Sequence, residues 1–148
     1  MREIKFRGRT AQGKWLYGDL EYRRATGVAV IHTYNEDGTY NRQEQVNPST
    51  VGQFTGLHDK NGKGIYEGDI IRIMYEIEVG KGRNRHVERA PVANDTPKVI
   101  DFRDGAFGYV NFYASTYQNE EWLPLLDELC EVIGNIHDNP ELLKGGEK

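Results

Sequence analysis

Apolar and polar side chains alternate over short stretches of this chain, which is the period of a β-strand with one buried face. Ile4 and Phe6, for example, alternate with charged residues near the start. Three Asn-Gly or Asp-Gly pairs, which tolerate the positive φ of hairpin turns, occur at 37–38, 61–62 and 104–105. Four segments rich in β-branched and aromatic residues flank the first and last pairs, at 28–34, 39–46, 98–102 and 107–112. The pattern predicts hairpins at these positions.

Helical signals are few and short. One turn is expected at 48–51. A short helix is expected within 120–130, beginning near Pro124, with Leu125, Leu126 and Leu129 on one face. Asn139 followed by Pro140 predicts a terminal helical turn, because asparagine caps helices and proline suits their first position.

Many short strands joined by glycine turns predict a mainly β fold. The two architectures that fit are a barrel-like fold and packed twisted sheets, with hairpins and one to three short helices. A length of 148 residues predicts a single domain over residues 1–148. Residues 79–97 hold several Gly and Pro and few apolar residues, so a long loop insertion is expected there. Residues 145–148 are expected to be a frayed tail.

Three motifs, in order along the chain, resemble those of the YopX family. The segments IKFRG (4–8) and WLYGDL (15–20) are similar to the family's opening strands. The best match runs from Pro48 to Ile70 and includes FTGLHDKNGKGIYEGDI, and EVIGNIHDNPELL (131–143) is similar to the closing motif. The resemblance leaves out residues 76–98. It implies a mostly β protein with barrel-like packing from phages or prophages, a family with no established biochemical activity and therefore no catalytic residues to transfer.

Composition restricts the function classes. The net charge of −4, from 19 basic and 23 acidic residues, argues against a protein that coats nucleic acid indiscriminately, because such binding depends on neutralising phosphates. The single cysteine, Cys130, excludes an intramolecular disulfide. No apolar run is long enough to span a bilayer, and the N-terminus lacks a signal-peptide core. A cytoplasmic protein without a membrane partner is predicted, in a bacterial host if the resemblance holds.

A basic segment lies within the expected insertion and contains Lys81, Arg83, Arg85, His86 and Arg89. Such a segment on an acidic protein can contact phosphate, so it is a candidate nucleic-acid interface. No aromatic residue lies among these charges to stack on a base, which weakens that interpretation. A solvated loop and an arm that packs on a neighbouring subunit are the alternatives.

A second candidate is the polar hairpin tip that contains His58, Asp59, Lys60 and Lys63. It is either a solvated turn or a recognition loop, since binding residues often lie on loops held by a rigid scaffold. Beyond it, Glu67 and Asp69 flank Gly68. This arrangement favours a turn that begins a strand, and the alternative is an acid pair for metal binding or acid–base catalysis.

No catalytic, metal-binding or cofactor motif is assembled in the sequence. The four histidines are scattered without metal-ligand spacing, and Cys130 is expected to be a buried thiol rather than a nucleophile paired with His137. The favoured function is that of a non-enzymatic phage or prophage accessory protein that binds a protein partner or forms a homo-oligomer. A nucleic-acid module that uses residues 81–89 is the alternative, and an enzyme that uses Glu67, Asp69 or His58 is least favoured.

Overall fold

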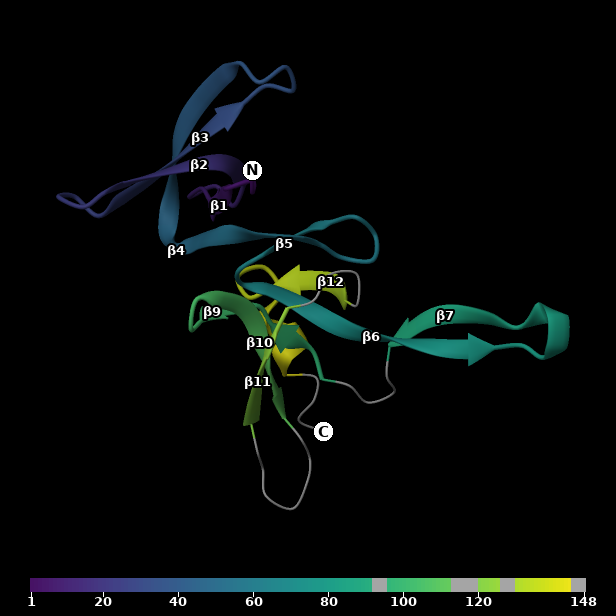
Figure 1. Ribbon diagram of the computed structural model, residues 1–148. Helices are drawn as coiled ribbons and strands as arrows, with labels where there is room; N and C mark the ends of the chain where they lie inside the picture. Colours follow the sequence, from purple (N-terminus) through teal and green to yellow (C-terminus); the bar gives the residue numbers. More distant parts are fainter. Residues whose placement is uncertain (92–95, 113–119, 126–129, 145–148) are drawn as a thin grey trace. The chain divides into compact units, whose positions relative to one another are not determined.

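A computed structural model describes residues 1–91, 96–112, 120–125 and 130–144 (Figure 1). The chain divides into two compact units, Met1–Gly56 and Leu57–Lys148. Strands dominate both units, and the described residues hold two short 3-10 helices, so the prediction of a mainly β fold with short helical turns is confirmed. The strands form several sheets. The single domain expected from chain length stays a prediction.

Unit 1 consists of four strands whose pairing returns to its starting point. They are β1 (Phe6–Arg9), β2 (Trp15–Arg23), β3 (Val28–Tyr34) and β4 (Tyr40–His58), the last of which continues into unit 2. Each strand pairs with the next, and β1 also pairs antiparallel with β4. The buried core contains Leu16, Ala29, Ile31 and Val46. Burial of these apolar side chains is the main stabilising contribution to the unit.

The turn expected at 48–51 is wrong, because these residues belong to β4. The local signals are nevertheless present as an irregularity within the strand. Ser49 N–H donates to Asn47 Oδ1 at 3.1 Å, and Thr50 Oγ1 donates to the Asn47 carbonyl at 2.6 Å. At the same place the register of β4 against β1 shifts. Long-range pairing with β1 therefore dominates over the local turn preference, which survives as a bulge.

Unit 2 contains the remaining elements. They are β5 (Gly64–Tyr66), β6 (Asp69–Val79), η1 (Gly82–Asn84), β7 (His86–Pro91), β8 (Lys98–Val99), β9 (Asp101–Arg103), β10 (Ala106–Phe112), β11 (Glu120–Pro124), β12 (Cys130–Asn135) and η2 (Pro140–Leu143). One sheet has the order β12-β6-β7 with β8 also paired to β6, a second has the order β11-β10-β9, and β5 pairs with β4. The core contains Ile65, Ile71, Ile100, Leu125 and Cys130.

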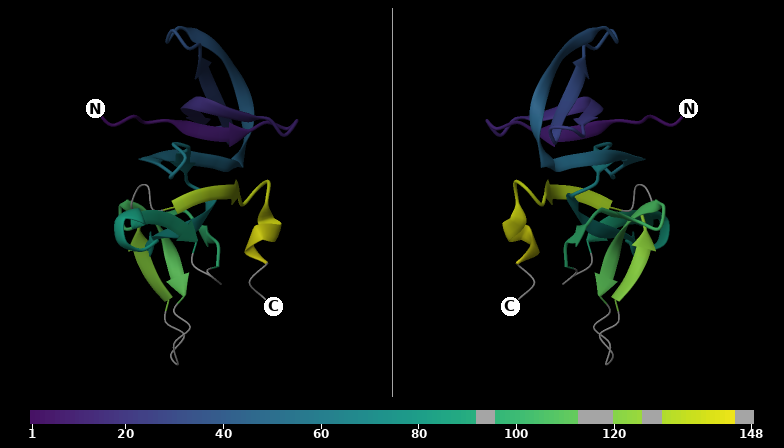
Figure 2. Two further views of the ribbon diagram at one scale, coloured as in Figure 1. Left: turned by 90° about the vertical axis from the view of Figure 1, so that its right-hand side faces the viewer. Right: turned by 90° about the vertical axis from the view of Figure 1, so that its left-hand side faces the viewer.

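The helix expected within 120–130 does not begin at Pro124, because residues 120–124 are a strand. These residues form β11, in which Trp122 pairs with Val110 and Leu123 with Tyr109. Residues 126–129 lie outside the described part of the chain. Cross-strand partners on β10 decide the conformation here, since a short segment has little intrinsic helix stability of its own. The helical turn expected near the C-terminus is confirmed as η2, which begins at Pro140 and is the yellow coil in Figure 2.

Residues 79–91 of the expected insertion form an ordered hairpin rather than a loop. β7 pairs antiparallel with β6 from Met74↔Pro91 to Val79↔His86, and η1 lies in the connection. We call residues 74–91 the arm; in Figure 1 it extends as a two-stranded ribbon beyond the segment of β6 that pairs with β12. Residues 92–95 of the insertion and the tail 145–148 lie outside the described residues.

The three glycine turn signals are confirmed, with positive φ at Gly38, Gly62 and Gly105. At 104–105 both turn residues have positive φ, 51° for Asp104 and 81° for Gly105, as a type I′ hairpin requires. No described helix is long and apolar enough to cross a bilayer.

Candidate functional site

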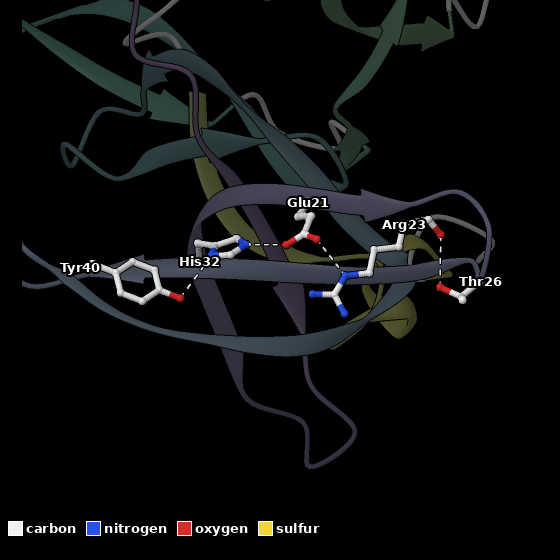
Figure 3. A network of polar contacts seen from close by, with 5 residues as sticks. All are labelled: Glu21, Arg23, Thr26, His32 and Tyr40. Atoms are coloured by element: carbon white, nitrogen blue, oxygen red, sulfur yellow. Dashed lines mark hydrogen bonds and ion pairs between the residues drawn. The ribbon is translucent and has the colours of Figure 1, made fainter.

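One face of the unit 1 sheet carries a connected set of polar and aromatic side chains, of which Figure 3 shows Glu21, His32 and Tyr40. Alternation along β2 places Asp19 and Glu21 on the face opposite the core residue Leu16. The register Asp19↔His32 brings His32 of β3 beside them, and the pairing Tyr34↔Tyr40 adds Tyr40 of β4. We call the set Asp19, Glu21, His32, Tyr34 and Tyr40 the tyrosine face.

His32 is held at both ring nitrogens. Its Nε2 lies 2.8 Å from Glu21 Oε2, and its Nδ1 lies 3.3 Å from the Tyr40 hydroxyl. A carboxylate only accepts hydrogen bonds, so Nε2 carries the proton and donates to Glu21. In the neutral ring Nδ1 then accepts from the Tyr40 hydroxyl, and in the charged ring Nδ1 donates to that oxygen. Both contacts are therefore available in either protonation state of His32.

The two tyrosines are exposed but oriented by their neighbours. Tyr34 is 48% exposed and Tyr40 is 54% exposed. The Tyr34 hydroxyl donates to Asp19 Oδ2 at 2.7 Å. The two tyrosine rings contact edge to face, with centroids 5.9 Å apart and an interplanar angle of 78°, and the His32 ring also lies 5.9 Å from Tyr40. Edge-to-face pairs are a favoured aromatic geometry, so the rings support one another.

The charges of this face are largely satisfied internally. Arg23 Nε donates to Glu21 Oε1 at 2.8 Å, so Glu21 lies between a guanidinium and His32. The hydrogen bonds from Arg23 and from His32 lower the pKa of Glu21 to about 2. The hydrogen bond to Asp19, with smaller contributions from desolvation and nearby charge, raises the pKa of Tyr34. Glu21 is therefore ionised and Tyr34 protonated at neutral pH.

The tyrosine face does not line the surface pocket of unit 1. A surface pocket of ≈ 580 Å³ in the same unit is lined by residues 10–12 and 44–48, and by none of the tyrosine face. The described residues contain no group of three or more His, Cys, Asp or Glu side chains placed to hold a metal ion. The aromatic rings and hydroxyls of the face offer apolar contact area together with hydrogen-bond donors and acceptors.

A family model described as "YopX protein" matches residues 5–144. The chain belongs to the YopX family. The crystal structure of protein EF1440 from Enterococcus faecalis is similar to it with 23% sequence identity and a TM-score of 0.47, over 97% of this chain and 99% of that one. No curated protein sequence matches the chain. The resemblance inferred from the three motifs is thus confirmed for the YopX family.

The hairpin tip of this YopX-family chain divides into a buried and an exposed part. His58, Lys60 and Lys63 are exposed, whereas Asp59 is only 3% exposed. Asp59 accepts backbone N–H bonds from Asn61, Lys63 and Val132 at 2.9, 2.9 and 3.0 Å. Burial opposes ionisation of this carboxyl, but the backbone donors outweigh it and lower its pKa. Asp59 therefore fastens the tip to β12, and the recognition loop stays a prediction for the exposed residues.

The basic segment lies in the arm, where part of its charge is compensated. Arg85 Nη2 donates to both carboxylate oxygens of Glu78, at 2.6 and 2.5 Å. His86 Nε2 lies 2.7 Å from Glu88 Oε1, and Lys81 and Arg83 are exposed in the connection. Only the backbone register of Arg89, opposite Glu76, is described. The structure thus places the four predicted contact residues on one hairpin without gathering them into a single described patch.

Two further candidates, Asp69 and Cys130, are buried. Asp69 is 2% exposed and its Oδ2 accepts the Tyr66 N–H at 2.8 Å, while Gly68 has φ of 87°, which is the geometry of a turn that begins a strand. Cys130 is 1% exposed. Burial, together with the charges of Asp59 and Asp69, raises its thiol pKa to about 11. A thiol protonated at neutral pH is a poor nucleophile.

Sequence reasoning did not identify the tyrosine face. The alternation of Asp19, Glu21 and Arg23 in WLYGDLEYRR was a usable signal for a polar strand face. Residues 28–34 were expected to be a strand, but their pairing with β2 was not predicted, because the β2–β3 turn uses Gly27, at φ of 71°, without an Asn-Gly or Asp-Gly pair. The register that brings His32 to Glu21 depends on that turn.

Proposed function

We propose that this chain is a non-enzymatic binding protein that holds a protein partner on its tyrosine face. The observation that supports this proposal is the fixed presentation of Tyr34, Tyr40 and His32 by hydrogen bonds and ring contacts on an exposed sheet face. Tyrosine is enriched among the residues that contribute most to protein–protein binding. A phage or prophage origin, which the family resemblance implies, remains a prediction. So does the cytoplasmic location.

Preorganisation gives the physical reason. Ordering a side chain that has many rotamers at an interface costs about 0.5–1.5 kcal/mol. The tyrosine rings already have defined partners, so binding orders less of the protein surface. Their hydroxyls keep hydrogen-bonding capacity toward a partner, because a phenolic oxygen both donates and accepts.

Charge favours a protein partner over nucleic acid at this face. Asp19 and Glu21 are carboxylates, and Arg23 is held by Glu21. A phosphate backbone would meet this acidic surface unfavourably, since nucleic-acid affinity depends on unpaired cations that displace counterions. Nucleic-acid contact through Lys81, Arg83, Arg85 and Arg89 remains the alternative function, carried by a different unit.

The test is affinity capture of the full tagged chain from a bacterial host lysate, with and without nuclease, in three versions. The test variant is the double substitution Tyr34→Ala and Tyr40→Ala. The matched control is Tyr22→Ala, because Tyr22 is also 54% exposed but alternates to the other side of β2 from Glu21. Circular dichroism confirms that each variant is folded.

The proposal expects a protein that is retained by the wild type and by the Tyr22 variant, survives nuclease, and is lost with the double variant. Retention that is equal in all three versions would contradict a role for the tyrosine face. Partners that disappear on nuclease treatment, and on neutralising the basic segment, would support the alternative instead.

A further inference from the structure

β7 is the outer strand of its sheet among the described residues. The sheet order is β12-β6-β7, and the other neighbours of β6 lie along its first half. The arm is therefore a ribbon of two strands over residues 74–91. Two-stranded ribbons are marginally stable in water, and an edge strand is a template for a further strand.

Pro91 determines which backbone groups of β7 point away from β6. In an antiparallel ladder, opposite residues alternate between pairs that exchange two N–H···O bonds and pairs that exchange none. Pro91 has no N–H, so Met74↔Pro91 is a pair of the second kind. The regular register then makes Ile77↔Glu88 a hydrogen-bonded pair. Consequently the backbone N–H and C=O of Val87 point away from β6, toward the free edge.

The same strand carries exposed apolar surface. Val87 is 58% exposed, whereas Ile77 of β6, 44% exposed, pairs with Glu88 and so lies on the other face of the ribbon. His86 and Glu88 flank Val87 and restrict which strand can pair with β7. Like charges directly opposite one another in a ladder are unfavourable, and opposite charges are favourable.

A second copy of β7 satisfies these conditions when the two strands pair about Val87. A two-fold axis perpendicular to the sheet at Val87 sets Val87 opposite its own copy, as a hydrogen-bonded pair. It sets His86 opposite Glu88 of the second copy, twice, in pairs whose side chains approach closely. An axis at Glu88 would oppose two glutamates and an axis at Arg89 two arginines, so charge favours the axis at Val87 over both of these.

This register also places Arg85 opposite Arg89 of the second copy. The Arg85 guanidinium is already bound by both oxygens of Glu78, which offsets the repulsion. The Arg85 N–H donates within the connection to the Gly82 carbonyl, at 3.4 Å, so Arg85 offers its carbonyl to the new ladder. Arg89 N–H is on the free edge and can donate to it.

We propose that two copies of this chain pair antiparallel through β7, with Val87 at the two-fold axis. The ladder is short, so the dimer is weak and its population depends on protein concentration. The pairing completes a four-stranded sheet from two arms. It is independent of the tyrosine face, which belongs to the other unit.

The test is sedimentation velocity of the full chain over a wide concentration series. Val87→Pro removes the N–H at the free edge and spares the donors that face β6, so it weakens dimerisation about tenfold or more, as the loss of two hydrogen bonds predicts. The matched control Val87→Thr keeps the N–H and the β-branched shape, and changes the dissociation constant by less than about threefold. Hydrogen exchange at the Glu88 amide reports whether the arm is intact in each variant.

A charge exchange tests the register without proline. Glu88→Arg weakens the dimer, because arginine then faces His86 of the second copy, and adding His86→Glu restores it. A chain that sediments as a monomer at every concentration would overturn the proposal. So would a dimer that is indifferent to Glu88→Arg, or one that survives Val87→Pro with an intact arm.

Discussion

Replacing Asp59 is expected to be among the most destabilising polar substitutions in unit 2. The carboxylate is almost fully buried and accepts three backbone N–H bonds, two from its own turn and one from Val132 on β12. Asp59→Ala removes both acceptor oxygens and so all three bonds. Asp59→Asn keeps one oxygen for the turn but presents an NH₂ group to the Val132 N–H, so only the long-range bond is lost.

The magnitude follows from the fate of each donor. The N–H groups of Asn61 and Lys63 belong to exposed residues and can bond to water, so their loss costs about 0.5–1.5 kcal/mol each. The Val132 N–H is partly buried, and leaving it unsatisfied costs about 1–3 kcal/mol. The free energy of unfolding should fall by roughly 3–5 kcal/mol in Asp59→Ala and by about half of that in Asp59→Asn.

Urea denaturation followed by circular dichroism measures these differences, and hydrogen exchange at Val132 locates them. The matched control is Asp37→Ala. Asp37 also precedes a turn glycine and accepts the Thr39 N–H, at 2.9 Å, but it is exposed and should cost about 1 kcal/mol or less.

Acid should also lower the stability of the fold, because it protonates Asp59. The folded-state pKa of Asp59 lies below its ordinary value of 3.8, so its stabilising contribution is complete above that pH and is lost as pH falls through the folded-state pKa. The wild type should therefore lose stability below pH 3.8 more steeply than Asp59→Asn. A change below about 1 kcal/mol in Asp59→Ala would refute the reasoning.

Three further predictions concern other positions. The Glu21 carboxyl should titrate with a pKa of about 2 by NMR, and Arg23→Gln should move that value toward 4.5. Gly18→Ala should destabilise unit 1 by about 2–3 kcal/mol in urea denaturation, because its Cβ would lie 1.9 Å from the His32 carbonyl oxygen; a variant as stable as the wild type would contradict this contact. Gly68→Val should lower thermal stability by about 2 kcal/mol, since valine at φ of 87° is strained, and an unchanged melting temperature would exclude the turn assignment.

The fold was predictable where the signal is local. Gly38, Gly62 and Gly105 mark hairpins because glycine tolerates positive φ, and Pro140 marks the last helical turn because its fixed φ suits a first helical position. The turn expected at 48–51 and the helix start expected near Pro124 were predicted wrongly. Residues 48–51 belong to a strand whose partner, β1, is distant in sequence, and 120–124 pair with the nearby strand β10. In both segments the cross-strand hydrogen bonds dominate over a weak local preference.

The candidate site was less predictable than the fold. Alternation shows that Asp19 and Glu21 share a face, but their contacts with Tyr34 and His32 depend on a hairpin register set by Gly27. Asp59 shows the opposite error. Its position in a polar hairpin tip indicated a solvated loop. Asp59 is instead buried, because its carboxylate accepts the backbone N–H of Val132, 73 residues away.

The charges of the arm bear on the two roles considered for it, nucleic-acid contact and pairing with a second copy. Residues 74–91 contain four lysines and arginines and three glutamates, so the segment is far less basic than 81–89 alone. Within the described contacts, Glu78 holds Arg85 and Glu88 holds His86. Cations already paired release fewer counterions on binding phosphate, which reduces affinity for nucleic acid. Acids and bases that alternate along a free strand edge instead restrict which strand can pair beside it, and that is the property a self-complementary dimer requires.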